Sequence, residues 1–379
     1  MNNKLFFFPF GIGIVLVFLA SMSACSRIDL SELFPKQEEL PTTPDPADPE
    51  DPQSPQTPPS QNPQPPQTPP EQNPQPPVVT SPHYTWYVSS NGSDGNSGAD
   101  SSSPLASVST ALSHIKSTYR SGKWPSGTSA VIEISGRIVG SATFGANDAM
   151  VDISGTGNYP PIILEGDPVH GGILDANKRT TDGRVLYIAN SKVTLGKNLV
   201  LTGGRMLMGG AVCIGENGTV SAGEFIVDGG EISGNHAGSG GAVMVYKGNM
   251  SMLSGVIKNN GNDFNHNLGD GGAVFLMEDT TLLISGGTVS DNGNMSKTIN
   301  GGGVYVNGQA TAIMTGGEIL RNTSGEAGGG VYIAPLGTFE MSGGMISGNT
   351  SKTGGGVGLS QYGAVFTHTG GTVSGNTPN

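Results

Sequence analysis

Cysteine and basic side chains are both scarce in this chain. Only 2 of its 379 residues are cysteine, which excludes a disulfide-stapled scaffold. Lysine and arginine together number 18 against 30 acidic residues, and the net charge of −12 argues against a nucleic-acid-binding protein, which needs clustered cations. Glycine and proline are abundant instead, with 61 and 26 residues, and this composition indicates repeats together with a low-complexity segment.

Residues 1–24 have the pattern of an export signal. Lys4 precedes an apolar run that ends at Ala20, and the small residues Ser23 and Ala24 stand before Cys25. The segment resembles a bacterial lipoprotein signal peptide, in which cleavage leaves a lipid-modified cysteine as the new N-terminus. The resemblance implies lipidation of Cys25, export, and anchoring to a membrane, at the outer membrane or the cell surface. The alternatives are a plain secretory signal and an uncleaved membrane helix.

Residues 25–81 are predicted to be a disordered, proline-rich linker. Sixteen of the 26 prolines lie between Pro41 and Pro77, and an 11-residue unit occurs twice, at Gln56–Pro66 and Gln67–Pro77. Because proline fixes φ and lacks an N–H donor, this tract favours an extended polyproline II conformation. We predict a spacer between the membrane and the rest of the chain. A docking site for a domain that reads polyproline is the alternative.

Two glycine motifs alternate through residues 209–379. The first, Gly-Gly-(Ala/Gly)-Val, begins at Gly209, Gly240, Gly271, Gly301, Gly328 and Gly354, with spacings of 26 to 31 residues. The second, Gly-Gly-x-(Ile/Val)-x-x-Asn, lies between successive copies of the first. Repetition at this period is typical of a solenoid, in which each repeat buries its apolar face against the next.

Each repeat also contains three short apolar alternations of period two, which is the period of a β-strand. Strands this short bury little alone, whereas coils stacked at about 4.8 Å form continuous parallel sheets around one core. We therefore predict an all-β, right-handed parallel β-helix with three sheets. Its inward columns are Val212, Val243, Val274, Val304, Val331 and Val357 in the first sheet, Phe225, Met250, Leu282, Ala312, Phe339 and Phe366 in the second, and Ile232, Ile257, Val289, Ile319, Ile346 and Val373 in the third.

An asparagine closes each copy of the second motif. A side-chain amide both donates and accepts hydrogen bonds, so stacked copies can bond to one another and to the turn backbone. We predict a structural asparagine ladder formed by Asn235, Asn260, Asn292, Asn322, Asn349 and Asn376.

The Gly-Gly-Ala-Val copies at Gly209, Gly240 and Gly271 resemble the repeats of chlamydial polymorphic membrane proteins, which are surface adhesins of the pectate-lyase-like β-helix superfamily. That family pairs the motif with Phe-x-x-Asn, and this chain has Ile or Val in the position of the Phe. The resemblance covers residues 209–379. It implies a non-enzymatic adhesin or interaction scaffold with a host protein or glycan as its partner.

Residues 82–208 are expected to hold an N-terminal cap and the first, less regular coils. Trp86–Gly95 looks like the entry segment of many secreted β-helix proteins. A helix is predicted after it, with Ser103 as N-cap, Pro104 in the first turn, and an apolar face that includes Leu112 and Ile115. Such a helix would cover the open end of the solenoid.

Groups suited to catalysis are sparse. A lyase that acts on uronate needs a basic residue and usually calcium, and the cations after Thr202 fall on different coils, at Arg205, Lys247, Lys258, Lys297, Arg321 and Lys352. A hydrolase needs converging carboxylates, and the densest group is Asp263, His266 and Asp270 on one loop. We assign no catalytic and no metal-binding residue. A polysaccharide lyase or glycoside hydrolase remains the alternative to the adhesin.

Two isolated features have a structural and a functional interpretation. The loop with Asp94 and Asp100 has the oxygen-rich composition of a calcium site, but its spacing is not that of an EF-hand. We therefore favour an ordinary Asx-turn over calcium and predict no cofactor. Cys213 alternates with inward residues, which predicts a modestly accessible, outward-facing thiol without a catalytic partner.

Four large apolar residues are predicted on the outer face of the first sheet. Met244, Phe275, Tyr305 and Tyr332 alternate with the inward valines on successive coils. Such an aromatic column can stack on sugars or anchor a protein partner, or its members can simply pair within the sheet. We predict that this column is the binding site.

Overall fold

The computed structural model describes residues 84–378, apart from 142–145, 156, 158, 179–180, 216–221 and 263–268. The predicted signal segment 1–24, the lipidation site Cys25 and the linker 25–81 lie outside the described residues. In the part of the chain that is described, no helix combines the length and the apolar character needed to cross a membrane.

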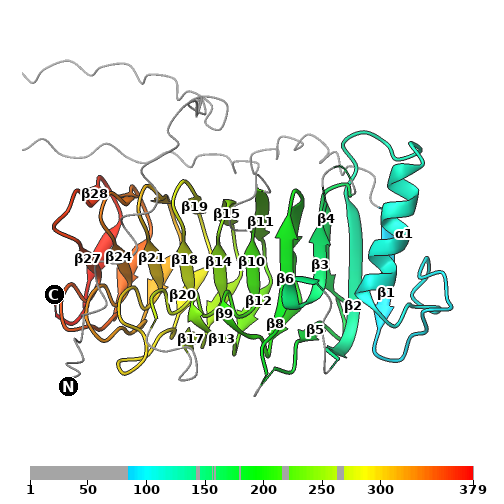
Figure 1. Cartoon of the computed structure of the whole chain (residues 1–379), viewed down its shortest axis with the longest axis horizontal. Helices are drawn as coiled ribbons and strands as arrows, with labels where there is room; N and C mark the ends of the chain where they lie inside the picture. The colour runs from blue at the N-terminus through cyan, green and yellow to red at the C-terminus, as the bar shows by residue number, and fades with distance from the viewer. Residues whose placement is uncertain are drawn as a thin grey trace, which may run out of the picture. The chain divides into compact units, whose positions relative to one another are not determined.

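The described residues form a right-handed parallel β-helix, as predicted (Figure 1). Three long sheets follow its axis, and strand β2 runs through both the second and the third. The first sheet contains β3 (Ala149–Ser154), β6 (Arg184–Ala189), β10 (Val212–Ile214), β14 (Val243–Val245), β18 (Val274–Leu276), β21 (Val304–Val306), β24 (Val331–Ile333) and β27 (Val357–Leu359). The second contains β1 (Tyr84–Ser89), β2 (Ala130–Val139), β4 (Ile162–Gly166), β7 (Lys192–Leu195), β11 (Gly223–Val227), β15 (Gly248–Met252), β19 (Thr281–Ile284), β22 (Thr311–Met314), β25 (Thr338–Met341) and β28 (Val365–His368). The third contains the end of β2, then β5 (Gly172–Asp175), β8 (Leu199–Thr202), β12 (Glu231–Ser233), β16 (Val256–Lys258), β20 (Thr288–Ser290), β23 (Glu318–Leu320), β26 (Met345–Ser347) and β29 (Thr372–Ser374).

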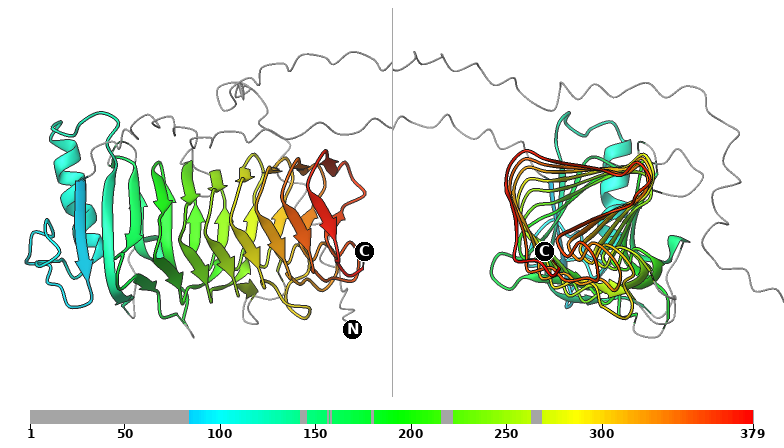
Figure 2. Two further views of the ribbon diagram at one scale, coloured as in Figure 1. Left: turned by 180° about the vertical axis from the view of Figure 1, so that it is seen from behind. Right: turned by 90° about the vertical axis from the view of Figure 1, so that its left-hand side faces the viewer.

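The register of all three predicted columns is confirmed. Val212 pairs with Val243, Phe225 with Met250, and Ile232 with Ile257, and the same pairing continues from coil to coil to the last described turn. Viewed along the axis, the successive coils therefore overlay one another (Figure 2).

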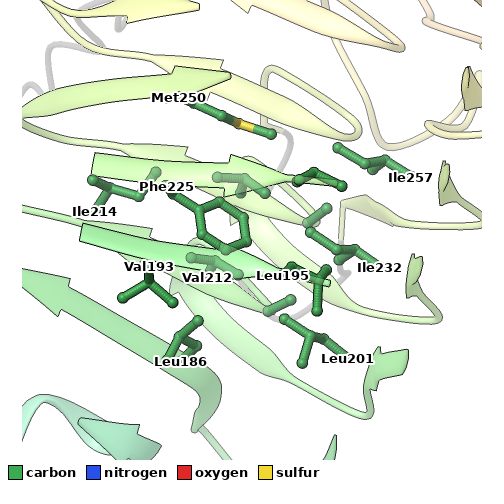
Figure 3. Close-up of a cluster of buried hydrophobic side chains, with 14 of the residues drawn as sticks. Leu186, Val193, Leu195, Leu201, Val212, Ile214, Phe225, Ile232, Met250 and Ile257 are labelled. Carbon is green, nitrogen blue, oxygen red and sulfur yellow. The ribbon is translucent and has the colours of Figure 1, made fainter. Parts of the chain in front are cut away.

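The space between the sheets is filled by these columns. Phe225 lies among residues such as Ile214 and Met250, and all of them are fully or almost fully buried (Figure 3). Full burial of one such side chain stabilises a fold by about 1.5 to 3 kcal/mol, so the stacked columns provide the main driving force for the coil.

The Gly-Gly-Ala-Val motif makes a tight corner between coils. Gly240 has a φ of +62°, and a Cβ on Gly241 would lie 2.2 Å from the carbonyl oxygen of Gly272 in the next coil. The following N–H groups of Ala242 and Val243 both donate to the one carbonyl of Ala273, at 2.9 Å each. This local bulge buries both side chains in the core, which explains why the position before the valine is small.

The predicted contacts of the asparagine ladder are present. Asn292 accepts hydrogen bonds from the backbone N–H and the side-chain Nδ2 of Asn260, each at 3.0 Å. It donates in turn to Asn322 Oδ1 from both of its nitrogens at 3.0 Å, and to the carbonyl of Ile257 at 2.9 Å. The residue before each ladder asparagine has a φ between 52° and 67°, so a left-handed turn aims the amide into the stack.

Helix α1 (Val108–Arg120) covers the N-terminal end of the coil and buries Val108, Leu112 and Ile115 (Figure 1). The prediction that Ser103 caps it is wrong, because Leu105 pairs with β1 instead of starting a helix: its N–H donates to Tyr87 and its carbonyl accepts from Ser89, both at 2.9 Å. Ser107 is the N-cap, and its hydroxyl accepts from the N–H of Thr110.

A fourth, short sheet was not predicted. Strands β9 (Arg205–Met208), β13 (His236–Ser239) and β17 (Gly261–Asn262) pair in parallel between the third and the first sheets. A short 3-10 helix, η2 (Ala146–Asp148), precedes β3. The short sheet matters because cavities lie on both sides of it.

We expect Asn292→Ala to destabilise the fold by about 3 kcal/mol or more, because it leaves several buried donors and acceptors without partners. Chemical unfolding followed by circular dichroism measures this change. The exposed Asn249 is the matched control, and its replacement by alanine should change stability by less than about 0.5 kcal/mol. Equal effects of the two substitutions would contradict a stabilising ladder.

Candidate functional site

A groove of about 540 Å³ follows the corner between the third sheet and the short sheet. Its lining starts at β2 and passes the ends of β5, β8 and β12 before it reaches the loop after β20. These segments belong to successive coils, and five steps of about 4.8 Å give the groove a length of roughly 24 Å. The groove is therefore an elongated site that several coils build together.

Cations dominate the lining of this groove. They are Arg137, Lys178, Arg205 and Lys297, and the imidazole of His236 lines the groove with them. Lys178, Arg205 and Lys297 are only 4%, 6% and 3% exposed, which is unusual for these residue types. The lining thus concentrates positive charge in a chain whose net charge is −12.

The carboxylate of Asp175, in the groove lining, accepts hydrogen bonds from neighbouring residues. Its Oδ2 accepts hydrogen bonds from Nε of Arg137 at 3.0 Å and from Nη2 of the same guanidinium. Its Oδ1 accepts from the N–H of Asn177 at 2.8 Å. This acid therefore orients Arg137 at the edge of the groove. A second acid, Asp182, lies 3.6 Å from Nη1 of Arg205 through its Oδ1.

One end of the groove is a loop pinned to the short sheet. The N–H of Lys178 donates to the carbonyl of Gly203 at 2.8 Å, and its Nζ donates to the carbonyl of Ser141 at 2.9 Å. Gly183 and Arg205 exchange two backbone hydrogen bonds, at 2.7 and 2.8 Å, as an antiparallel bridge. These contacts hold the ammonium of Lys178 and the guanidinium of Arg205 in the same groove.

The other end is a turn that positions Lys297. The buried hydroxyl of Thr298 donates to Asn262 Oδ1 at 2.6 Å and accepts from the N–H of Asn294 at 3.0 Å. Asn262 Nδ2 donates to the carbonyl of Gly238 at 2.8 Å, which ties the turn to the coils below it. Lys297 therefore sits on a braced turn.

The cations after Thr202 lie on different coils, as expected, but different coils can contribute to one groove. Stacking brings Arg205 and Lys297 together with Arg137 and Lys178, which precede the glycine-rich repeats. Lys258 and Arg321 instead form surface ion pairs with Glu231 and Asp291 of neighbouring coils. His236 and Lys297 lie in the segment that follows a ladder asparagine, whereas Arg137, Lys178 and Arg205 precede the first of these asparagines and had no such signal in the sequence.

The aromatic column has the predicted register but not the predicted exposure. Met244 is fully buried and Phe275 is 9% exposed, because Met208, Tyr246 and other apolar side chains pack against the outer face of the first sheet. Tyr305 and Tyr332 are half-buried. The rings of Phe275 and Tyr305 stack with centroids 4.6 Å apart, and those of Tyr305 and Tyr332 lie 5.4 Å apart. Pairing within the sheet therefore accounts for much of this column, and only its two tyrosines offer surface to a partner.

Cys213 belongs to the same covered surface. It is 6% exposed, so the expected accessible thiol is wrong. It pairs in register with Tyr187 and Met244, and the apolar side chains that cover Met244 also shield the sulfur.

Asp270 lies close to the aromatic column. Burial raises the pKa of its carboxyl to about 6, although Oδ1 accepts hydrogen bonds from the N–H and Nδ2 of Asn300 at 3.0 and 3.1 Å. Burial, followed by the charge of Asp270, also raises the pKa of Tyr305. Asp263 and His266, which sequence analysis grouped with Asp270, lie outside the described residues.

The loop after β1 uses its carboxylates in its own hydrogen bonds. Asp94 Oδ1 accepts from the N–H of Ser107 at 2.9 Å, and Oδ2 accepts from the hydroxyl of the same residue at 2.9 Å. Asp100 accepts from the N–H of Ser102 at 2.8 Å, and this bond lowers the pKa of Asp100. Among the residues that the structure describes, no three His, Cys, Asp or Glu side chains gather as a metal site.

Comparison with known proteins finds no family model, no curated protein and no solved structure that matches this chain.

We expect Asp270→Asn to stabilise the protein at high pH. Between pH 3.8 and about 6 the folded protein binds more protons at Asp270 than the unfolded chain does, so stability falls as the pH rises through this window. Asparagine has no charge to bury, and its side-chain oxygen can still accept the hydrogen bonds from Asn300. The variant should gain up to about 3 kcal/mol at pH 8, and the gain should shrink as the pH falls from 6 to 4.

Thermal and chemical unfolding of both proteins across this pH range tests the prediction. A stability difference that is independent of pH would contradict it.

Proposed function

We propose that this protein is a displayed, non-enzymatic binding protein, and that its β-helix holds an acidic polysaccharide in the basic groove. The observation that carries the proposal is the gathering of Lys178, Arg205 and Lys297 in one elongated groove, with Arg137 at its edge. The proposal keeps the predicted interaction scaffold with a glycan partner. It moves the principal contact from the aromatic column to the groove.

The charge of the groove favours an anionic ligand. Lysine and arginine form charge-assisted hydrogen bonds with carboxylates and sulfates, and these bonds are stronger in a partly desolvated groove than in water. The surrounding chain is acidic, so an anionic ligand finds favourable potential at the groove and repulsion over much of the remaining surface. This contrast provides selectivity for the site.

The shape of the groove favours a polymer. Its lining repeats with the coil spacing over roughly 24 Å, which is longer than a single sugar. Cations at both ends, Lys178 and Lys297, suit a chain with negative charges at intervals. The polar residues between them, including Thr202 and Asn262, can bond to sugar hydroxyls.

The display of this domain is the second part of the proposal. An export signal over residues 1–24, a lipid on Cys25 and the linker 25–81 would hold the β-helix at a distance from the membrane. A protein held in this way meets polysaccharides of its own envelope or of a host surface.

A polysaccharide lyase is the second candidate, and the same groove favours it. Cations that neutralise a uronate carboxylate acidify the adjacent C–H. A neutral lysine or histidine then takes that proton, the C–H electron pair forms the C=C bond, the glycosidic C–O bond breaks, and the departing sugar oxygen takes a proton from water. Lys178, Lys297 and His236 are the candidate bases. The binding experiment distinguishes the two candidates.

We expect the purified protein to bind polygalacturonate, an acidic polymer, and not the neutral polymer dextran. Lys178→Gln and Lys297→Gln should each weaken binding about tenfold, because each removes a charge-assisted contact. Binding should also weaken as salt is raised from 0.05 to about 0.5 M. Calorimetry at several salt concentrations measures these effects.

The exposed Lys123 in the loop after α1 does not line the groove and is the matched control, and Lys123→Gln should bind like the native protein. Equal binding of dextran, or an equal loss in the control, would refute the groove as the site. Shortened polygalacturonate with unsaturated ends, absent with Lys178→Gln, would establish the lyase instead.

A further inference from the structure

A second cavity lies on the other side of the short sheet, over the outer face of the first sheet. Its volume is about 260 Å³. Met206, Leu207 and Met208 of β9 form an apolar wall, and Tyr187 and Tyr246 contribute aromatic rings. A cavity of this size suits a small molecule and not a polymer.

Arg184 gives this apolar cavity a buried positive charge. The residue is 8% exposed, and its Nε is buried without a hydrogen-bond partner. Within the described residues, no carboxylate lies at ion-pair distance from its guanidinium. A buried N–H donor without a partner costs free energy, and a ligand that accepts a hydrogen bond from Nε would remove this cost.

We propose that this cavity binds a small monocarboxylate with an apolar or aromatic body, and that Arg184 receives the carboxylate. The planar guanidinium presents paired N–H donors that match the two oxygens of a carboxylate. The methionines, Leu207 and the tyrosines accommodate the apolar body of the ligand.

The charged residues that line the cavity favour a ligand with a single negative charge. Arg184 is the one cation among the described residues that line the cavity, and Asp148 adds an exposed carboxylate at its edge. A dianion such as phosphate would meet repulsion from Asp148 without a second cation to balance it. This site is separate from the basic groove, and the inference does not depend on the function proposed for the groove.

The test uses 3-phenylpropionate and its neutral analogue 3-phenylpropanamide, each titrated into the purified protein by calorimetry. The native protein should bind the acid at least tenfold more tightly than the amide. Arg184→Gln should bring the ratio of the two affinities close to one, because it removes the charge and keeps hydrogen-bond donors. Circular dichroism verifies that the variant is folded.

Leu207→Ser provides a second, independent variant, because Leu207 is exposed and its replacement does not disturb the core. It should weaken both probes by a similar factor and leave their ratio unchanged. The exposed Lys123 is the control, and Lys123→Gln should leave both affinities unchanged.

Three results would overturn the inference. They are no binding of the acid up to its solubility limit, equal affinity of acid and amide for the native protein, or a native ratio retained by folded Arg184→Gln. If Arg184→Gln does not fold, the native ratio and the Leu207→Ser result decide the question, since unchanged affinity of both probes in Leu207→Ser also refutes the site.

Discussion

Close approach of neighbouring coils at their corners is the constraint on which the rest of this structure depends. The asparagine ladder can form only if equivalent backbone atoms recur at the strand spacing, and its 3.0 Å bonds leave little freedom in that spacing. The glycine corners meet the same requirement, because a Cβ on Gly241 would collide with the neighbouring coil. Once the corners are fixed, the valine, phenylalanine and isoleucine columns follow, and the apolar core forms along the whole axis.

The same constraint explains where the chain is free to carry function. Residues in the three long sheets must pair with the coils on either side, so their outward-facing positions have a fixed spacing. The segments between a ladder asparagine and the next glycine pair lie outside these three sheets and do not have this constraint. Both ends of the basic groove are outside the long sheets, in the loop that holds Lys178 and in the turn that holds Lys297, and the buried Thr298 shows how such a turn is anchored locally.

Much of the fold could be predicted from the sequence, because stacking repeats the same physical requirement in every coil. The period-two alternation identified which side of each strand faces the core, and the recurring asparagine identified a hydrogen-bonded stack. The start of the helix was predicted too early because Leu105 forms backbone hydrogen bonds with β1 and is not part of the first helical turn. These are tertiary contacts, which the local sequence does not show. The short sheet was missed because its strands, such as β17 at Gly261–Asn262, have no apolar period.

The site was harder to predict than the fold. Arg137 and Lys297 are far apart in the chain, and only the stacking of the coils between them brings them to one groove. The exposure of Met244 and Phe275 was overestimated for a related reason, since alternation says which face a side chain takes and not what covers that face. Cover comes from β9 and from side chains such as Tyr246, which belong to other parts of the repeat.

The segment between a ladder asparagine and the next glycine pair differs in length from coil to coil, and this variation has an evolutionary consequence. The stretches 236–239, 261–270, 293–300, 323–327 and 350–353 all connect a ladder asparagine to the next glycine pair, yet the strands on either side keep their register. Insertions and deletions there alter the surface of one coil without shifting its neighbours. Descendants of this architecture can therefore acquire new ligand preferences by lengthening a single connection, while the folding of the whole domain stays the same.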